Sequence, residues 1–154
     1  MILLKSYYQL CKPNVVYMML ICAFVGMLLA EDTINSIGYL FLSLTGIAFC
    51  AASAAAVNQV IDRNTDASMT RTDQRPLPQG ELSAKHASIF ALVIGIIGAL
   101  ILYIYVNTLT MLLTLASLVG YAFIYTIYLK RATPQNIVIG GLAGAAPPLL
   151  GWSS

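Results

Sequence analysis

Charged side chains are scarce in this sequence. They make up 9% of its 154 residues, whereas soluble domains carry about 25%. Hydrophobic residues make up 59%, and the mean hydropathy is +0.82. A chain with so little charge cannot cover a surface that faces water on every side, which excludes an ordinary soluble domain. We therefore predict a membrane protein whose partner is the lipid bilayer, and we expect no nucleic acid among its partners.

Cysteine is also scarce. Cys11, Cys22 and Cys50 lack the spacing of a metal site, and all three lie in or beside apolar stretches. We interpret them as small apolar side chains. Internal repeats, low-complexity tracts and a separate soluble domain are likewise missing from the sequence.

Long apolar stretches make up most of the chain. Four of them are roughly long enough to cross a bilayer as helices, and they cover residues 14–30, 34–57, 87–106 and 109–129. A fifth, 137–152, begins in the same way and reaches the end of the chain. We predict an all-α, polytopic transmembrane helix bundle of about five spans, forming a single membrane domain over residues 1–154. Because the chain ends within an apolar segment, we expect the protein to continue beyond it.

The basic residues indicate how the bundle is oriented. All of them fall on one side of the predicted spans: Lys5, Lys12, Arg63, Arg71, Arg75, Lys85, Lys130 and Arg131. The positive-inside rule makes this side cytoplasmic, together with the N-terminus. The first span lacks a secretory cleavage site, so we expect it to be retained. A bacterial cytoplasmic (inner) membrane is the favoured location.

The segment 58–84 is the long polar connection, and we predict that it lies in the cytoplasm. If the second helix continues past residue 57, then Asn58, Asp62 and Asp66 follow one another at intervals of four residues and share one face. Their side-chain oxygens are the kind of ligand that Mg²⁺ prefers. We therefore predict that these three residues bind the metal and serve catalysis. The alternative is that Asp62 pairs with nearby arginines and only caps the bundle.

Two arginines follow the acidic residues. Arg71 and Arg75 are again four residues apart, and Pro76 and Pro78 stiffen the chain after them. Guanidinium groups bind phosphate oxygens in pairs. Metal-binding carboxylates beside such arginines at a membrane surface predict a site for a diphosphate with a lipid tail. Loss of the diphosphate would produce an allylic carbocation, which an electron-rich acceptor in the apolar bundle would trap.

At these residues the sequence resembles a known family. The run Asn58-x-x-x-Asp62-x-x-x-Asp66 resembles the first aspartate-rich motif of the intramembrane prenyltransferases. Three longer strings, and the pair Lys12-Pro13, are similar to the protohaem IX farnesyltransferase family. The strings are Met69-x-Arg71-Thr72-x-x-Arg75-Pro76-Leu77-Pro78-x-Gly80, Tyr125-Thr126-x-x-Leu129-Lys130-Arg131-x-Thr133-Pro134-Gln135-Asn136 and Gly140-Gly141-x-x-Gly144-Ala145-x-Pro147-Pro148-Leu149-x-Gly151-Trp152.

The resemblance implies the front part of a nine-helix prenyltransferase fold and a definite reaction. Asn58, Asp62 and Asp66 would bind the Mg²⁺–diphosphate of farnesyl diphosphate, while Arg71, Arg75 and Lys130 would hold the diphosphate oxygens. The acceptor would be the vinyl group of protohaem IX, and the product haem O. The family has a second aspartate-rich motif between its sixth and seventh helices, which this chain does not reach. We therefore expect residues 1–154 alone to be inactive.

Other interpretations remain open on the residues alone. The acceptor could be the ring of a quinone precursor, and the chain could instead be part of a membrane transporter or a purely structural subunit. Tyr121 and Tyr125 are spaced to lie on one face, where they could stabilise a cation or simply pack. His86 lies at a predicted helix start, and we interpret it as a solvated or capping residue rather than a haem ligand.

Overall fold

The protein is a bundle of helices, seen here in a computed structural model that describes residues 2–30, 36–129 and 136–154. The elements are α1 (Ile2–Leu10), α2 (Pro13–Leu29), α3 (Ile37–Ala67), α4 (Ala84–Tyr105), α5 (Thr108–Val119), the π-helix η1 (Gly120–Leu129) and α7 (Asn136–Trp152). These ranges contain no β-strand. The predicted all-α class is thereby confirmed.

The helices differ in whether they can cross a membrane. With 31 and 22 residues, α3 and α4 are long and apolar enough, and α1 with α2 would form a third span despite a 44° bend between them. The apolar helix Thr108–Phe123 and the 17 residues of α7 are shorter than the ~20 of a typical straight crossing, although η1 continues the chain of α5 to Leu129 without a gap. The described residues therefore contain two or three of the five predicted spans, judged by length and composition.

Side-chain caps fix where several helices begin. Ser83 Oγ accepts a hydrogen bond from the backbone N–H of His86 at the start of α4, and Asn107 caps α5 in the same way through Thr110 N. The His86 ring is exposed and also bonds to Ser83 Oγ, at 2.9 Å. Pro13 stands in the first turn of α2, where its missing N–H is not needed.

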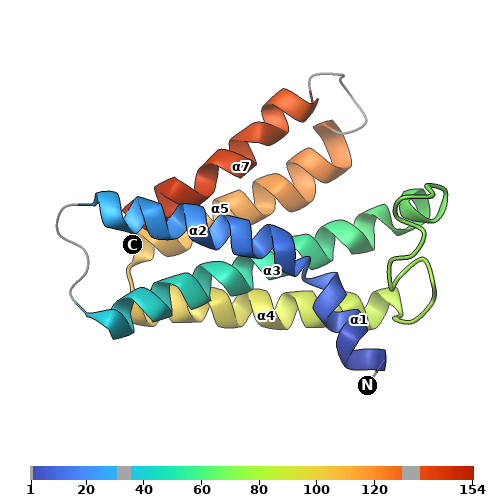
Figure 1. The fold of residues 1–154 in the computed structure, drawn as a ribbon, viewed down its shortest axis with the longest axis horizontal. Helices are drawn as coiled ribbons and strands as arrows, with labels where there is room; N and C mark the ends of the chain where they lie inside the picture. The colour runs from blue at the N-terminus through green and yellow to red at the C-terminus, as the bar shows by residue number, and fades with distance from the viewer. Residues whose placement is uncertain (1, 31–35, 130–135) are drawn as a thin grey trace.

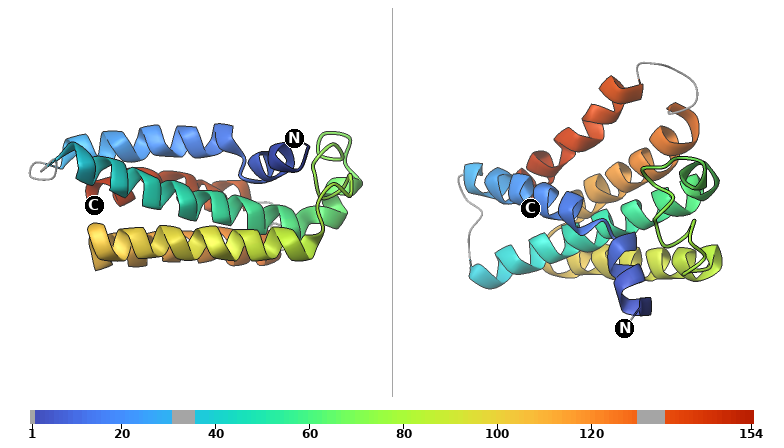
Figure 2. Two further views of the ribbon diagram at one scale, coloured as in Figure 1. Left: turned by 90° about the horizontal axis from the view of Figure 1, so that it is seen from below. Right: turned by 45° about the vertical axis from the view of Figure 1, so that its right-hand side comes forward.

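The central element is α3, which lies between α2 and α4 (Figures 1 and 2). Small residues let α3 and α4 approach closely: a Cβ on Gly98 would come within 2.8 Å of the Gly46 carbonyl oxygen. Ser53 Oγ donates to the carbonyl of Ala91 across the same interface, at 2.7 Å. Close packing therefore explains the small residues on this face of α3.

Helices α2 and α7 cross in close contact at the opposite end from α1 (Figure 1). A Cβ on Gly26 would overlap the carbonyl of Pro148, and one on Gly151 would overlap the carbonyl of Ala23. Both positions therefore admit only glycine without a backbone shift. The two backbones touch here with no side chain between them.

The short helix α1 is an element that the sequence did not predict. It lies at the same end of the bundle as the polar segment 68–83 (Figure 1). Leu10 is fully buried, the rings of Tyr7 and Phe90 lie 4.8 Å apart, and Ser6 Oγ donates to Glu81 Oε2 at 2.6 Å. These contacts hold α1 across the ends of α3 and α4.

Candidate active site

The polar row, which consists of Asn58, Asp62 and Asp66, is part of one continuous helix. Because α3 runs on to Ala67, Asn58, Asp62 and Asp66 all belong to it, and their exposed fractions are only 5%, 3% and 4%. Asn58 Nδ2 donates to Asp62 Oδ2 at 3.0 Å, as expected for residues one turn apart on a shared face. Burial of two carboxylates beside an apolar bundle is costly unless charged or hydrogen-bonding groups compensate it.

Two residues from distant parts of the chain complete the surroundings of Asn58. Lys12 Nζ donates to Asn58 Oδ1 at 2.6 Å, and Asn58 Nδ2 also donates to Thr126 Oγ1 at 3.1 Å. Thr126 is fully buried in η1 and donates in turn to the carbonyl of Tyr121. The sequence assigned neither Lys12 nor Thr126 to the site, since each appeared only within a motif or as a topology signal.

The position of Lys12 depends on the break between α1 and α2. Lys12 has a φ of 49°, a left-handed conformation that is uncommon for a residue with a side chain. Gln59 holds the break in place, because its Nε2 donates to the carbonyls of Gln9 and Leu10 at 3.2 and 3.0 Å. Two neighbouring residues of α3 thus hold this region. Gln59 binds the backbone before Lys12, and Asn58 binds the ammonium group of Lys12.

Arg75 is brought to the other end of the polar row. Its guanidinium lies 2.5 Å from Asp66 Oδ2, with exposed side-chain fractions of 29% for Arg75 and 5% for Asp66. Thr72 Oγ1 donates to the Asp66 carbonyl at 3.0 Å, which ties the connecting segment to the end of α3, and Pro76 is buried behind the arginine. The alternative for Asp62 was that it pairs with a nearby arginine. The structure shows such a pair at Asp66, with Arg75.

A polar pocket of about 280 Å³ opens beside these residues. Its lining consists of Gln9, Lys12, Gln59, Arg71, Gln74, Arg75 and Pro76. Arg71 is exposed, so it can approach an anion in this pocket from the solvent side. Lys130, the remaining predicted phosphate ligand, lies outside the described residues.

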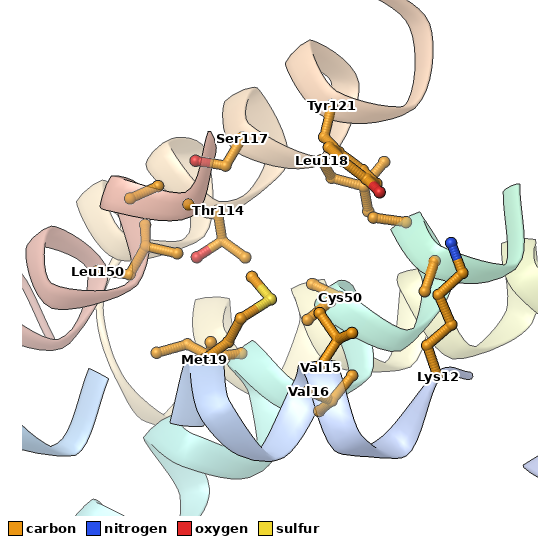
Figure 3. A pocket seen from close by; sticks show the side chains of 16 residues that line it. Lys12, Val15, Val16, Met19, Cys50, Thr114, Ser117, Leu118, Tyr121 and Leu150 are labelled. Atoms are coloured by element: carbon orange, nitrogen blue, oxygen red, sulfur yellow. The ribbon is translucent and has the colours of Figure 1, made fainter. Parts of the chain in front are cut away.

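An apolar cavity of about 300 Å³ lies on the bundle side of Lys12 (Figure 3). Residues of α2, α3, α5, η1 and α7 line it, and Lys12 lines both this cavity and the polar pocket. Small residues of α3 such as Ala51 and Ala55 form one wall. Tyr121 lines the cavity and stacks on Tyr125, with ring centroids 5.6 Å apart. The small residues of α3 therefore serve packing on one face and leave space on another.

The side-chain oxygens of Asn58, Asp62 and Asp66 are suited to part of the coordination shell of a magnesium ion. Within the described ranges, no group of three His, Cys, Asp or Glu side chains could hold a metal by itself. The row instead offers two carboxylates and one amide oxygen, and Mg²⁺ is commonly held by one or two carboxylates together with phosphate oxygens and water. These residues therefore fit a metal that arrives with a diphosphate better than a metal bound alone.

Curated proteins of similar sequence are known. The chain is 59% identical over 150 residues to protoheme IX farnesyltransferase 2 of Pseudoalteromonas atlantica and 57% identical to protoheme IX farnesyltransferase of Idiomarina loihiensis. These alignments include 97% of this chain but 49% and 50% of the relatives. The chain thus spans about half the length of the curated relatives it matches.

The fold also has a counterpart among solved structures. A UbiA homolog from Archaeoglobus fulgidus, bound to DMAPP and Mg²⁺, superposes with a TM-score of 0.83 at 20% identity, over 96% of this chain and 54% of that one. Residues 19–154 match the UbiA prenyltransferase family. The chain belongs to the UbiA prenyltransferase family.

Proposed function

We propose that this chain acts in the transfer of a farnesyl group from farnesyl diphosphate to the vinyl group of protohaem IX, which gives haem O. The observation that carries the proposal is the buried row of Asn58, Asp62 and Asp66, flanked by the cations of Lys12 and Arg75. Lys12, which bonds to Asn58, lines both a polar pocket and an apolar cavity, and Arg75 lines the polar pocket. Such a junction suits a substrate with an anionic head and an apolar tail.

The charged residues would bind and activate the diphosphate. Asn58, Asp62 and Asp66 would hold Mg²⁺, which supplies positive charge against the leaving diphosphate when it is bound. Arg75 would hold diphosphate oxygens from one side and Lys12 from the other, while Arg71 would contribute from the solvent side. Lys130 would be a further ligand of these oxygens. Their positive charges stabilise the negative charge that develops as the bond from diphosphate oxygen to C1 of the farnesyl group breaks.

The apolar cavity would protect the carbocation that remains. The terminal vinyl carbon of protohaem IX forms the new bond to C1 of the farnesyl group. The positive charge then moves to the other vinyl carbon, which takes a water oxygen while that water loses a proton. Tyr121 lines the cavity, and its π face is suited to stabilise the first cation.

The relatives favour haem over a quinone precursor as acceptor. Two relatives with 59% and 57% identity are both named as protohaem IX farnesyltransferases. The one-sided cations support a cytoplasmic N-terminus and a site that opens to the cytoplasm. We therefore propose that the enzyme resides in the bacterial inner membrane and draws both substrates from its cytoplasmic side.

The test uses an assembled enzyme, defined as residues 1–154 co-expressed with the second half of the Pseudoalteromonas atlantica relative. Incubation with farnesyl diphosphate, Mg²⁺ and protohaem IX should give a product with the mass of haem O. Residues 1–154 alone should bind the diphosphate weakly and transfer nothing, because the acids of one helix leave much of the metal's coordination shell to water. Transfer to a quinone precursor but not to haem would overturn the acceptor assignment.

A further inference from the structure

The apolar cavity has a polar end, here called the mouth, and an apolar end, here called the end wall. Lys12 and Tyr121 lie at the mouth, and Met19 lies seven residues further along α2, about 10 Å deeper at the helical rise. Ile47 of α3 and Leu150 of α7 also line the cavity, and both belong to a buried apolar cluster with Ala23, which lies about one turn beyond Met19 on α2. Figure 3 shows Lys12 at one end and Leu150 at the other.

The apolar end of the cavity lies next to a tight backbone contact between α2 and α7. Just beyond Met19, α2 meets α7 where Ala23 lies against Gly151 and Gly26 against Pro148. The same end is tied by Thr110 Oγ1, which donates to the carbonyl of Ser153 at 2.6 Å. Because these contacts are between backbones, only the side chains in front of them can change the depth of the cavity.

The depth can be compared with the length of a prenyl chain. Ile47 lies eleven residues from Asn58 along α3, about 16 Å at the helical rise. An extended peptide residue has three backbone bonds and spans about 3.4 Å, so an isoprene unit with four bonds spans about 4.5 Å. Three units therefore need about 14 Å and four need about 18 Å. The rise from Asn58 to Ile47 is therefore longer than three isoprene units and shorter than four.

Resting on the proposed function, we propose that Met19, Ile47 and Leu150 form the end wall that limits the prenyl donor to three isoprene units. Their side chains meet the last isoprene unit of a bound farnesyl chain. A shorter geranyl chain leaves part of the cavity unfilled, which loses apolar contact. The residues thus determine chain length without touching the reacting atoms.

The test changes the depth of the cavity at Met19 in the assembled enzyme. Geranyl, farnesyl and geranylgeranyl diphosphates compete for protohaem IX, and product masses give the kcat/KM ratios. Met19→Ala should raise the ratio of geranylgeranyl to farnesyl transfer at least about tenfold, the lower end of what one methylene discriminates in an apolar pocket. Met19→Phe should shift transfer toward geranyl by a similar factor. Met18→Ala is the matched control, because Met18 is 66% exposed on the outer face of α2.

The outcomes separate the inference from the function on which it rests. If the unaltered assembled enzyme transfers none of the three chains, the proposed function fails and the inference fails with it. If it transfers farnesyl but Met19→Ala and Ile47→Ala both leave the ratios unchanged, only the end wall is refuted. An equal shift from Met18→Ala would also refute it, since the effect would then not come from the cavity.

Discussion

The pair formed by Asp66 and Arg75 gives the sharpest test of whether the polar row serves catalysis or only stability. Their side chains are 5% and 29% exposed, and the charged atoms are 2.5 Å apart. Arg75→Met would leave the buried Asp66 carboxylate without this partner. Breaking a buried pair costs about 3–5 kcal/mol, and we expect the lower end, because Arg75 is partly in contact with solvent.

A double variant removes both charges of the pair but should not restore farnesyl transfer. In Asp66→Asn with Arg75→Met no charge remains at this position, so most of the lost stability should return. Transfer should stay low in both variants, because the proposed metal ligand or the phosphate-binding guanidinium is missing. We expect a loss of about a hundredfold or more, equivalent to about 2.7 kcal/mol of transition-state stabilisation.

Both quantities can be measured on the assembled enzyme. Denaturant unfolding in detergent gives the stability of each single variant and of the double variant, and the cycle isolates the coupling between the two residues. Transfer from farnesyl diphosphate gives kcat/KM for the same preparations. If the double variant recovered both stability and near-normal transfer, the pair would be structural and our assignment of Asp66 and Arg75 to the reaction would be wrong.

Three further predictions concern other parts of the site and the fold. Asp62→Ala should abolish transfer while unfolding stays near normal, and a well-folded variant with ordinary activity would refute the metal assignment. Gln59→Leu should remove the bonds that hold the break before Lys12, which we expect to raise KM for farnesyl diphosphate about tenfold, whereas Gln79→Leu on the exposed loop should not. A cysteine at Gln79 should react only with a reagent applied from the cytoplasmic side. Labelling from outside would show that the predicted orientation is wrong.

The sequence predicted the helical bundle well because its signals are local. The apolar runs 14–30, 87–106 and 109–129 showed where α2, α4 and α5 lie. The shared face of the polar row depended on the second helix continuing past residue 57, and α3 does continue, as far as Ala67. Helix α1 was missed because its nine residues give no long apolar run, and its stability comes from packing against α3 and α4.

The sequence also identified the residues of the row, but not the partners of Asn58. Lys12 and Asn58 are 46 residues apart and Asn58 and Thr126 are 68 apart, so no local spacing links them. The left-handed backbone at Lys12 and the π-helix around Thr126 are set by contacts between helices. Tertiary packing therefore brought Lys12 and Thr126 to Asn58, while the pattern of the chain revealed the acids and the arginines that follow them.

The charges of the site explain why diphosphate and metal would bind together. Asp62 and Asp66 carry two negative charges, and Lys12 and Arg75 beside the row carry two positive ones. A diphosphate alone would add negative charge to a buried region that is already balanced, which is unfavourable. A divalent cation that binds the carboxylates offsets this charge, and it leaves the ammonium and guanidinium groups to the phosphate oxygens. The same four side chains that neutralise one another within the protein can then divide between a metal and an anion.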